Sequence, residues 1–141
     1  MHDEPGRTVS IWMSEEVPQL PALSTGAHAD VCVVGAGIAG VTTAYCLMKE
    51  GLSVILLDDS QPGRGMTERT TAHLSHAIDS GYVELERLHG RSGARLAAES
   101  HTAAIDWIEK TTNEAEIACK FLRVNGYLCA ASPDDTQRIK D

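Results

Sequence analysis

The sequence predicts an α/β protein whose first structured part is a β-α-β unit. Three observations predict this fold class. A strand-like apolar run at residues 31–34 leads into spaced glycines, a helix-like stretch follows the glycines, and a second apolar run at 54–57 is followed by an acid. Strand, helix and strand in this order are typical of two parallel strands joined by a crossover helix.

The glycines of the turn between the first strand and the helix indicate a dinucleotide site. Gly35 permits a tight turn, and the missing side chain of Gly37 lets the backbone approach a pyrophosphate. Gly40 lets the helix pack closely on the sheet. A phosphate here would meet the N–H groups and positive dipole end of the helix, so Ile38 and Ala39 join the glycines as predicted cofactor-binding residues.

The helix is predicted to turn its smallest side chains to the sheet. On a period of 3.6 residues one face carries Gly37, Gly40, Ala44 and Leu47. Gly51 is expected to end the helix. The apolar run at 54–57 predicts a fully buried parallel strand over 53–57, and Cys32 and Cys46 are expected to be small core residues.

Asp58 follows the second strand directly and lies 18 residues beyond Gly40. This is close to the offset of about 20 expected for the acid that hydrogen-bonds a ribose hydroxyl. Asp59 is the alternative residue for this contact. An acid here disfavours a 2′-phosphorylated ribose, because two negative charges would be forced together. The sequence therefore predicts FAD or NAD as the cofactor.

The segment after the acid distinguishes between FAD and NAD as the predicted cofactor. A plain NAD-binding domain would continue with another crossover helix and a third strand. Residues 59–81 are instead rich in Gly, Ser, Thr, Pro and charge, and contain no apolar run long enough for a strand. This favours FAD and leaves an NAD-linked dehydrogenase as the alternative.

With these features the chain resembles the FAD-dependent oxidoreductases of the D-amino-acid oxidase (DAO) type. The resemblance rests on residues 30–58, with the glycine pattern extended to Ala44, and on a second Gly and Ser/Thr segment at 63–73. It implies a Rossmann-like FAD/NAD(P)-binding unit of a flavoprotein, here incomplete. A flavoprotein of another class, such as a monooxygenase, is an alternative.

Further residues resemble the DAO subgroup that carries a C-terminal Rieske iron–sulfur domain. They are Trp12 with the prolines that follow it, residues 69–75 and residues 85–90. The likeness runs from about residue 9 to 128 and corresponds to the first third of such a protein. At Glu68 the chain departs from the glycine that this subgroup favours.

The resemblance implies that residues 63–73 run along the cofactor's pyrophosphate towards the flavin. Arg69 would neutralise a phosphate, and Thr70 and Thr71 would offer hydroxyl and N–H donors. His73 is expected to hydrogen-bond the cofactor or the loop backbone, with covalent flavin attachment as a rarer alternative. A solvated surface loop is the other interpretation of this segment.

The resemblance also implies an activity, the oxidation of a C–N bond of an amine or amino acid by hydride transfer to flavin. Oxygen or a [2Fe–2S] centre would accept the electrons. Such a centre would belong to a missing C-terminal domain, because the chain has no Rieske set of paired Cys and His. Catalytic residues of the family come mostly from the substrate domain, so none is predicted here, and no metal site is predicted either.

The second half of the chain is predicted to be helical and then to form a β-hairpin. One helical face carries Leu85, Leu88, Leu96, Ser100, Ala103, Ala104, Trp107 and Ile108, of which Trp107 and the leucines are expected in the core. A break at 90–93 predicts two helices. Asn125-Gly126 predicts a two-residue hairpin turn between strands at 117–124 and 127–131.

These patterns divide the chain into three parts. Residues 1–29 are expected to form an extended arm, 30–81 the FAD-binding unit with its second cofactor loop, and 82–141 a helical segment with the start of the substrate domain. Only two parallel strands are recognisable where a nucleotide-binding half has three, which predicts a fragment of a longer protein. A non-enzymatic remnant is therefore a further alternative.

Composition limits the partners of the chain. The net charge of −8 over 141 residues argues against nucleic-acid and anionic-membrane partners, and the expected partner is a small-molecule substrate. There is no signal peptide and no apolar run of transmembrane length, so a cytoplasmic protein is expected.

Overall fold

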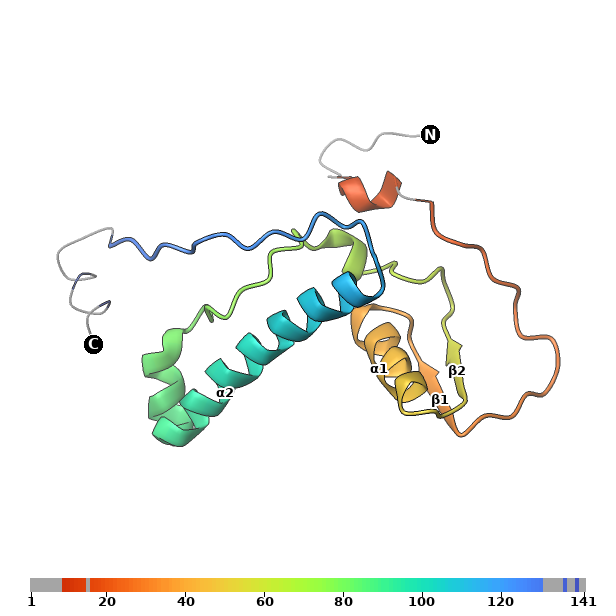
Figure 1. The fold of residues 1–141 in the computed structure, drawn as a ribbon, viewed down its shortest axis with the longest axis horizontal. Helices are drawn as coiled ribbons and strands as arrows, with labels where there is room; N and C mark the ends of the chain where they lie inside the picture. Colours follow the sequence, from red (N-terminus) through yellow and green to blue (C-terminus); the bar gives the residue numbers. More distant parts are fainter. Residues whose placement is uncertain (1–8, 15, 131–135, 137–138, 140–141) are drawn as a thin grey trace. The chain divides into compact units, whose positions relative to one another are not determined.

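The computed structural model describes residues 9–14, 16–130, 136 and 139. In chain order its elements are η1 (Ile11–Ser14), β1 (Val31–Val34), α1 (Ile38–Lys49), β2 (Val54–Leu57), η2 (Thr67–Arg69) and α2 (Gly81–Glu114) (Figure 1). Internal contacts divide the chain into two units, Met1–His73 and Leu74–Asp141. The three-part division of the sequence stays a prediction.

The first unit contains the predicted β-α-β arrangement. Strands β1 and β2 are parallel and in register, with Val31 opposite Val54 and Val34 opposite Leu57. Helix α1 connects the two strands and contacts both of them (Figure 1). The α/β fold class is therefore confirmed, and no further strand lies between Asp58 and Ser80.

Helix α1 turns its smallest residues to the sheet, as predicted. Ala44 is buried, whereas Ile38 and Met48 on other faces are each 62% exposed. At Gly40 an added Cβ would overlap the Gly35 carbonyl oxygen and lie 3.5 Å from Val33 Cγ1. The helix can approach the strand this closely only because Gly40 has no side chain.

The end of α1 also follows the prediction. Gly51 has a φ of 84°, which favours glycine. Its N–H donates to the Met48 carbonyl oxygen at 3.0 Å, and the Leu52 N–H donates to the Leu47 carbonyl oxygen at 3.2 Å. These two hydrogen bonds form a Schellman motif, which ends the helix and directs the chain into β2.

Side chains fix the start of the two strands against each other. Asp30 Oδ2 accepts hydrogen bonds from the N–H of Ser53 at 2.8 Å and from its hydroxyl at 2.6 Å. The hydroxyl and backbone hydrogen bonds of Ser53 lower the pKa of Asp30. At the other end of the pair, the Gly35 N–H donates to the Leu57 carbonyl oxygen at 2.7 Å.

The second strand was predicted to be fully buried, and this prediction was wrong. All four residues of β2 are half-exposed, and in β1 Cys32 is exposed and Val34 is 82% exposed. Cys46 on α1 is exposed as well. A parallel sheet is buried when helices cover both faces, and among the described residues of this unit only α1 covers the sheet.

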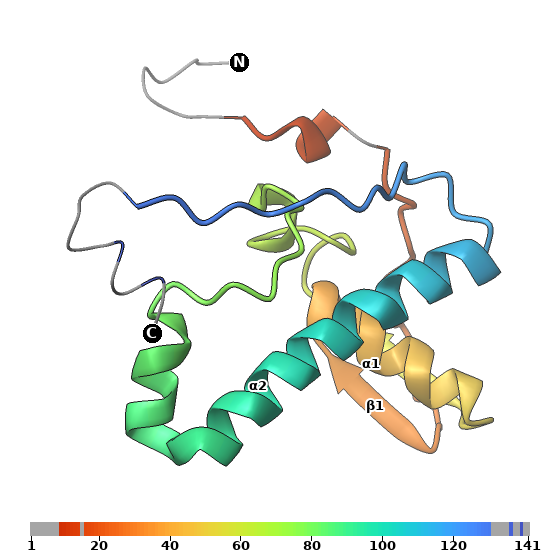
Figure 2. The same cartoon turned by 60° about the vertical axis from the view of Figure 1, so that its left-hand side comes forward.

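The second unit is dominated by α2, which bends at Gly90 (Figure 2). Gly90 has φ 71° and ψ 167°, a conformation essentially restricted to glycine. The predicted break in the helical segment is therefore confirmed.

The prediction that one face of this helical segment lies in the core is wrong, because Leu88 is 56%, Leu96 66% and Trp107 37% exposed. Among its described residues this unit has no second long helix or sheet that would cover that face.

The predicted β-hairpin is also not formed. Residues 118–130 contain neither helix nor strand, and residue 131 lies outside the described residues. The apolar side chains that should line a hairpin face are exposed, with Leu122 and Val124 at 78% and Tyr127 at 82%. A two-stranded hairpin is marginal alone and needs a further strand or helix against its apolar face.

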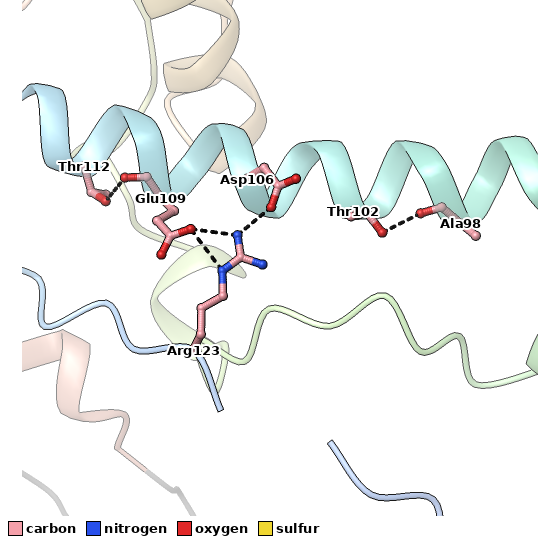
Figure 3. Close-up of polar contacts among 6 residues, drawn as sticks. All are labelled: Ala98, Thr102, Asp106, Glu109, Thr112 and Arg123. Carbon is pink, nitrogen blue, oxygen red and sulfur yellow. Dashed lines mark hydrogen bonds and ion pairs between the residues drawn. The ribbon is translucent and has the colours of Figure 1, made fainter. Parts of the chain in front are cut away.

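An arginine from this extended segment forms ion pairs with α2. The Arg123 guanidinium lies 2.5 Å from Asp106 Oδ1 and 2.7 Å from Glu109 Oε2 (Figure 3). The two carboxylates lie three residues apart on one face of the helix, so a single guanidinium reaches both. All three side chains are more than a third exposed, so the contribution to stability is screened by water and salt.

Candidate cofactor-binding site

The turn between β1 and α1, residues 35–40, presents backbone donors at the start of the helix. Gly35 has a φ of 101°, which turns the chain sharply out of β1. Gly37 is the N-cap of α1 and offers no side chain to cap it. Among the described residues, the N–H groups of Ala39 and Gly40 have no acceptor. These donors and the helix dipole together favour an anion at this place.

Asp58 joins the end of β2 to this turn. Its Oδ2 accepts a hydrogen bond from the Ala36 N–H at 2.5 Å, and its Oδ1 accepts from the N–H of Ser60 at 2.8 Å and from its hydroxyl at 2.6 Å. These bonds, the one from Ala36 above all, lower the pKa of Asp58 to about 2. The carboxylate is therefore ionised at neutral pH.

The exposed Asp58 carboxylate still has room for a ligand. A carboxylate has about four acceptor positions. The contacts to Ala36 and Ser60 use three of them, which leaves one position for a hydroxyl group. No hydrogen bond joins Asp59 to the glycine turn within the described part of the chain, so Asp58 is the acid that the structure brings to it.

The second predicted segment, residues 63–73, lies against the same turn. The Gly63 N–H donates to the Ala36 carbonyl oxygen at 2.8 Å. The Ile38 N–H, the first of α1, donates to the Thr67 hydroxyl oxygen at 3.0 Å. The structure therefore brings the two glycine-rich segments together, as the prediction that both serve one cofactor requires.

The predicted side chains of this loop lie away from these contacts. Arg69, Thr70, Thr71 and His73 are exposed, and none of them hydrogen-bonds the glycine turn in the described part of the structure. Thr67, which was not predicted, is the residue that does. Its only sequence signal is a hydroxyl within a segment rich in Gly and Thr, and this signal does not tell which hydroxyl faces the turn.

Trp12 of η1 also contacts the loop at residues 63–73. Its indole N–H donates to the Thr70 carbonyl oxygen at 2.9 Å. Trp12 and Thr70 border a hollow of about 280 Å³, which is also lined by Pro62, Arg64 and Glu68. Trp12 thus contacts the segment 63–73, and neither Asp58 nor the glycines of residues 35–40 line this hollow.

The charge of Glu68, where the subgroup favours glycine, is compensated locally. Glu68 Oε2 lies 2.7 Å from Arg64 Nη1, and its side chain is only 12% exposed. This hydrogen bond lowers the pKa of Glu68 and keeps the carboxylate ionised beside the guanidinium. The pair therefore adds little net negative charge near the glycine turn.

Comparison with known proteins gives the family. The model of the family described as FAD dependent oxidoreductase (DAO) matches residues 30–141. The chain belongs to this family. The FAD-binding domain of the DAO family is an α/β fold, so membership agrees with the parallel strands and crossover helix of the first unit.

Several curated proteins resemble this DAO-family chain. A Bacillus subtilis (strain 168) protein named as a Rieske 2Fe-2S iron–sulfur protein, YhfW, is 37% identical over 89% of the chain and 25% of its own length. An oxidoreductase by name, OrdL of Haemophilus influenzae, is 30% identical over 80% of the chain and 26% of its own length. The γ-glutamylputrescine oxidoreductase of Escherichia coli K12 is 27% identical over 65% of the chain and 22% of its own length.

The chain thus spans about a quarter of the length of these relatives. No solved structure matches the chain. Among the described residues, no helix of this DAO-family chain combines the length and the apolar composition needed to cross a membrane.

Proposed function

We propose that the first unit of this DAO-family chain binds the ADP part of FAD at residues 35–40 and Asp58. The observation that carries the proposal is the hydrogen bond from the Ala36 N–H to Asp58. It holds an ionised acceptor for a ribose hydroxyl next to the first turn of α1, whose N–H groups favour a pyrophosphate.

The described residues suit this part of the cofactor. The N–H groups of Ala39 and Gly40 would receive the pyrophosphate, and Gly37 leaves the backbone accessible to it. Asp58 would accept a ribose hydroxyl at its remaining acceptor position. In this proposal the loop at 63–73 leads towards the flavin, with Arg69, Thr70, Thr71 and His73 available along it.

We further propose that the complete protein oxidises a C–N bond of a small amine or amino acid. Bound FAD would supply the chemistry by accepting a hydride equivalent from the substrate carbon. Support comes from the DAO family and from the E. coli relative, whose name contains an amine, γ-glutamylputrescine. A [2Fe–2S] centre, which the name of the B. subtilis relative includes, would be an electron acceptor outside this chain. No nucleic-acid or membrane partner is expected.

Cofactor binding is tested by titrating the purified chain with FAD and, separately, with NAD. The expected result is a perturbed visible spectrum of FAD and FAD affinity at least tenfold higher than NAD affinity. Gly37→Val should abolish FAD binding, because a Cβ there would already lie 3.3 Å from the Thr67 hydroxyl and would block the phosphate.

The matched control is Gly26→Val, since an added Cβ at Gly26 meets nothing within 4 Å. Tighter binding of NAD than of FAD would favour the NAD-linked alternative and contradict the proposal. Absence of binding of either cofactor would contradict the assignment of the site itself.

The substrate class is tested on the full-length gene product. Anaerobic addition of amines and amino acids to the FAD-loaded protein should bleach the oxidised flavin absorbance, and hydroxy acids of similar size should leave it unchanged. Bleaching by a hydroxy acid alone would contradict C–N oxidation while leaving the proposal for FAD binding intact.

A further inference from the structure

One hydrogen bond joins the N-terminal 3-10 helix η1 to the end of the second glycine-rich loop. The indole N–H of Trp12 donates to the Thr70 carbonyl oxygen at 2.9 Å, across 58 positions of the sequence. The elements η1 and η2 also contact each other. Among the described residues, no other hydrogen bond reaches residues 70–73 from outside the loop. Trp12 is therefore the external anchor of this end of the loop.

The backbone just after Thr70 is strained. Ala72 has a φ of 55°, in the left-handed region, which a residue with a Cβ adopts only at a cost in free energy. The local hydrogen bonds are long. The Thr70 N–H and hydroxyl donate to the Thr67 carbonyl oxygen at 3.4 and 3.3 Å, and the Ala72 N–H donates to the Thr70 hydroxyl oxygen at 3.4 Å. Bonds of this length are weak and offset little of the strain.

The start of the same loop has separate anchors. Two hydrogen bonds join Gly63 and Thr67 to the glycine turn, at 2.8 and 3.0 Å. Neither of these bonds involves residues 70–73. The loop is thus held at its start by the glycine turn and near its end by Trp12. A change at Trp12 can therefore release the end of the loop and leave the start in place.

We infer that Trp12 is a positioning residue of the proposed FAD site. Its indole N–H holds the Thr70 carbonyl group and keeps residues 70–73 in the strained left-handed turn, which relaxes when this bond is absent. Trp12 acts through the loop and does not touch the cofactor itself. The inference rests on the proposed function, in which the glycine turn receives the ADP part of FAD and this end of the loop leads towards the flavin.

The inference is tested by titrating the full chain separately with FAD and with ADP. Trp12→Phe keeps an apolar ring and removes the N–H. It should weaken FAD binding by about three- to tenfold, as expected for one hydrogen bond, and should leave ADP affinity within about twofold. Trp107→Phe is the matched control, because it makes the same replacement on α2 in the second unit. It should change neither affinity.

A second measurement asks whether Trp12 offsets the strain at Ala72. Ala72→Gly removes the Cβ that makes the left-handed turn unfavourable, so the turn should depend less on Trp12. In the Ala72→Gly background, Trp12→Phe should therefore reduce FAD affinity by no more than about twofold, a smaller loss than in the unaltered chain. A tryptophan that only packs against the loop would give the same loss in both backgrounds.

Each contrary outcome has its own meaning. Unchanged FAD affinity in Trp12→Phe would overturn the inference and leave the proposed function standing. Equal losses of FAD and ADP affinity, or unfolding of the variant, would also overturn it and would assign Trp12 to the stability of the first unit. An equal loss in the Ala72→Gly background would overturn the role of Trp12 in holding the strained turn. If the unaltered chain bound neither FAD nor ADP, the proposed function would fail first and the inference with it.

Discussion

Replacement of Asp58 tests the geometry of the proposed site most specifically. In Asp58→Ala the carboxylate that accepts from Ala36 and Ser60 is lost, together with the one acceptor position that remains for a ribose hydroxyl. The hydrogen bonds to Ala36 and Ser60 exist with and without ligand, so they largely cancel in the binding equilibrium. The expected loss is therefore one hydrogen bond to a charged group, or about ten- to hundredfold in the Kd for FAD.

The assay is quenching of flavin fluorescence on titration with the protein. Asp59→Ala is the matched control, because it removes the neighbouring carboxylate and leaves the Asp58 contact to Ala36 in place. Far-UV circular dichroism verifies that both variants are folded. If Asp58→Ala bound FAD as tightly as the unaltered chain and Asp59→Ala bound it weakly, the ribose contact would belong to Asp59 and the reasoning would be refuted.

The same hydrogen bonds predict a dependence of stability on pH. The pKa of Asp58 in the folded chain is about 2, below the ordinary aspartate pKa of 3.8. Its contribution is present above the unfolded pKa and is lost as the pH falls from about 4 through about 2. In urea unfolding, the unaltered chain should lose more stability than Asp58→Ala over this interval. Parallel curves for the two proteins would contradict the low pKa.

Two glycine substitutions test the fold itself by urea unfolding followed by circular dichroism. Gly40→Ala should destabilise the first unit by about 1–3 kcal/mol, because the new Cβ overlaps the Gly35 carbonyl oxygen, whereas Gly26→Ala, with open space around it, should change little. Gly90→Ala should cost about 1–3 kcal/mol in the second unit, because alanine is strained at φ 71° and ψ 167°. Gly126→Ala is its control, and equal midpoints within either pair would contradict the explanation for that glycine.

Local signals predicted the first unit well. The spacing of the glycines, the end of α1 at Gly51 and the acid after β2 are properties of short segments, and the structure places all three as expected. A strand, a glycine turn and a helix are fixed by neighbouring residues. The conformation that each of these short segments prefers is therefore the conformation that it adopts in the folded unit.

Features that depend on distant segments could not be predicted. The contact of Thr67 with Ile38 depends on how the second loop returns to the helix. The exposure of Cys32 depends on whether a second layer covers the sheet. At Asn125-Gly126 the turn signal is local, but paired strands also need a surface to pack on, and the apolar side chains of Leu122, Val124 and Tyr127 remain exposed.

The most direct test of the central claim is a two-dimensional ¹H–¹⁵N NMR titration of the chain with FAD. The account predicts that the amide signals of Ile38, Ala39 and Gly40 shift most, together with that of Thr67, and that signals from α2 around Thr102 stay in place. If FAD left the first-turn signals of α1 unchanged, or shifted only residues of the second unit, the assignment of the glycine turn as the cofactor site would be contradicted.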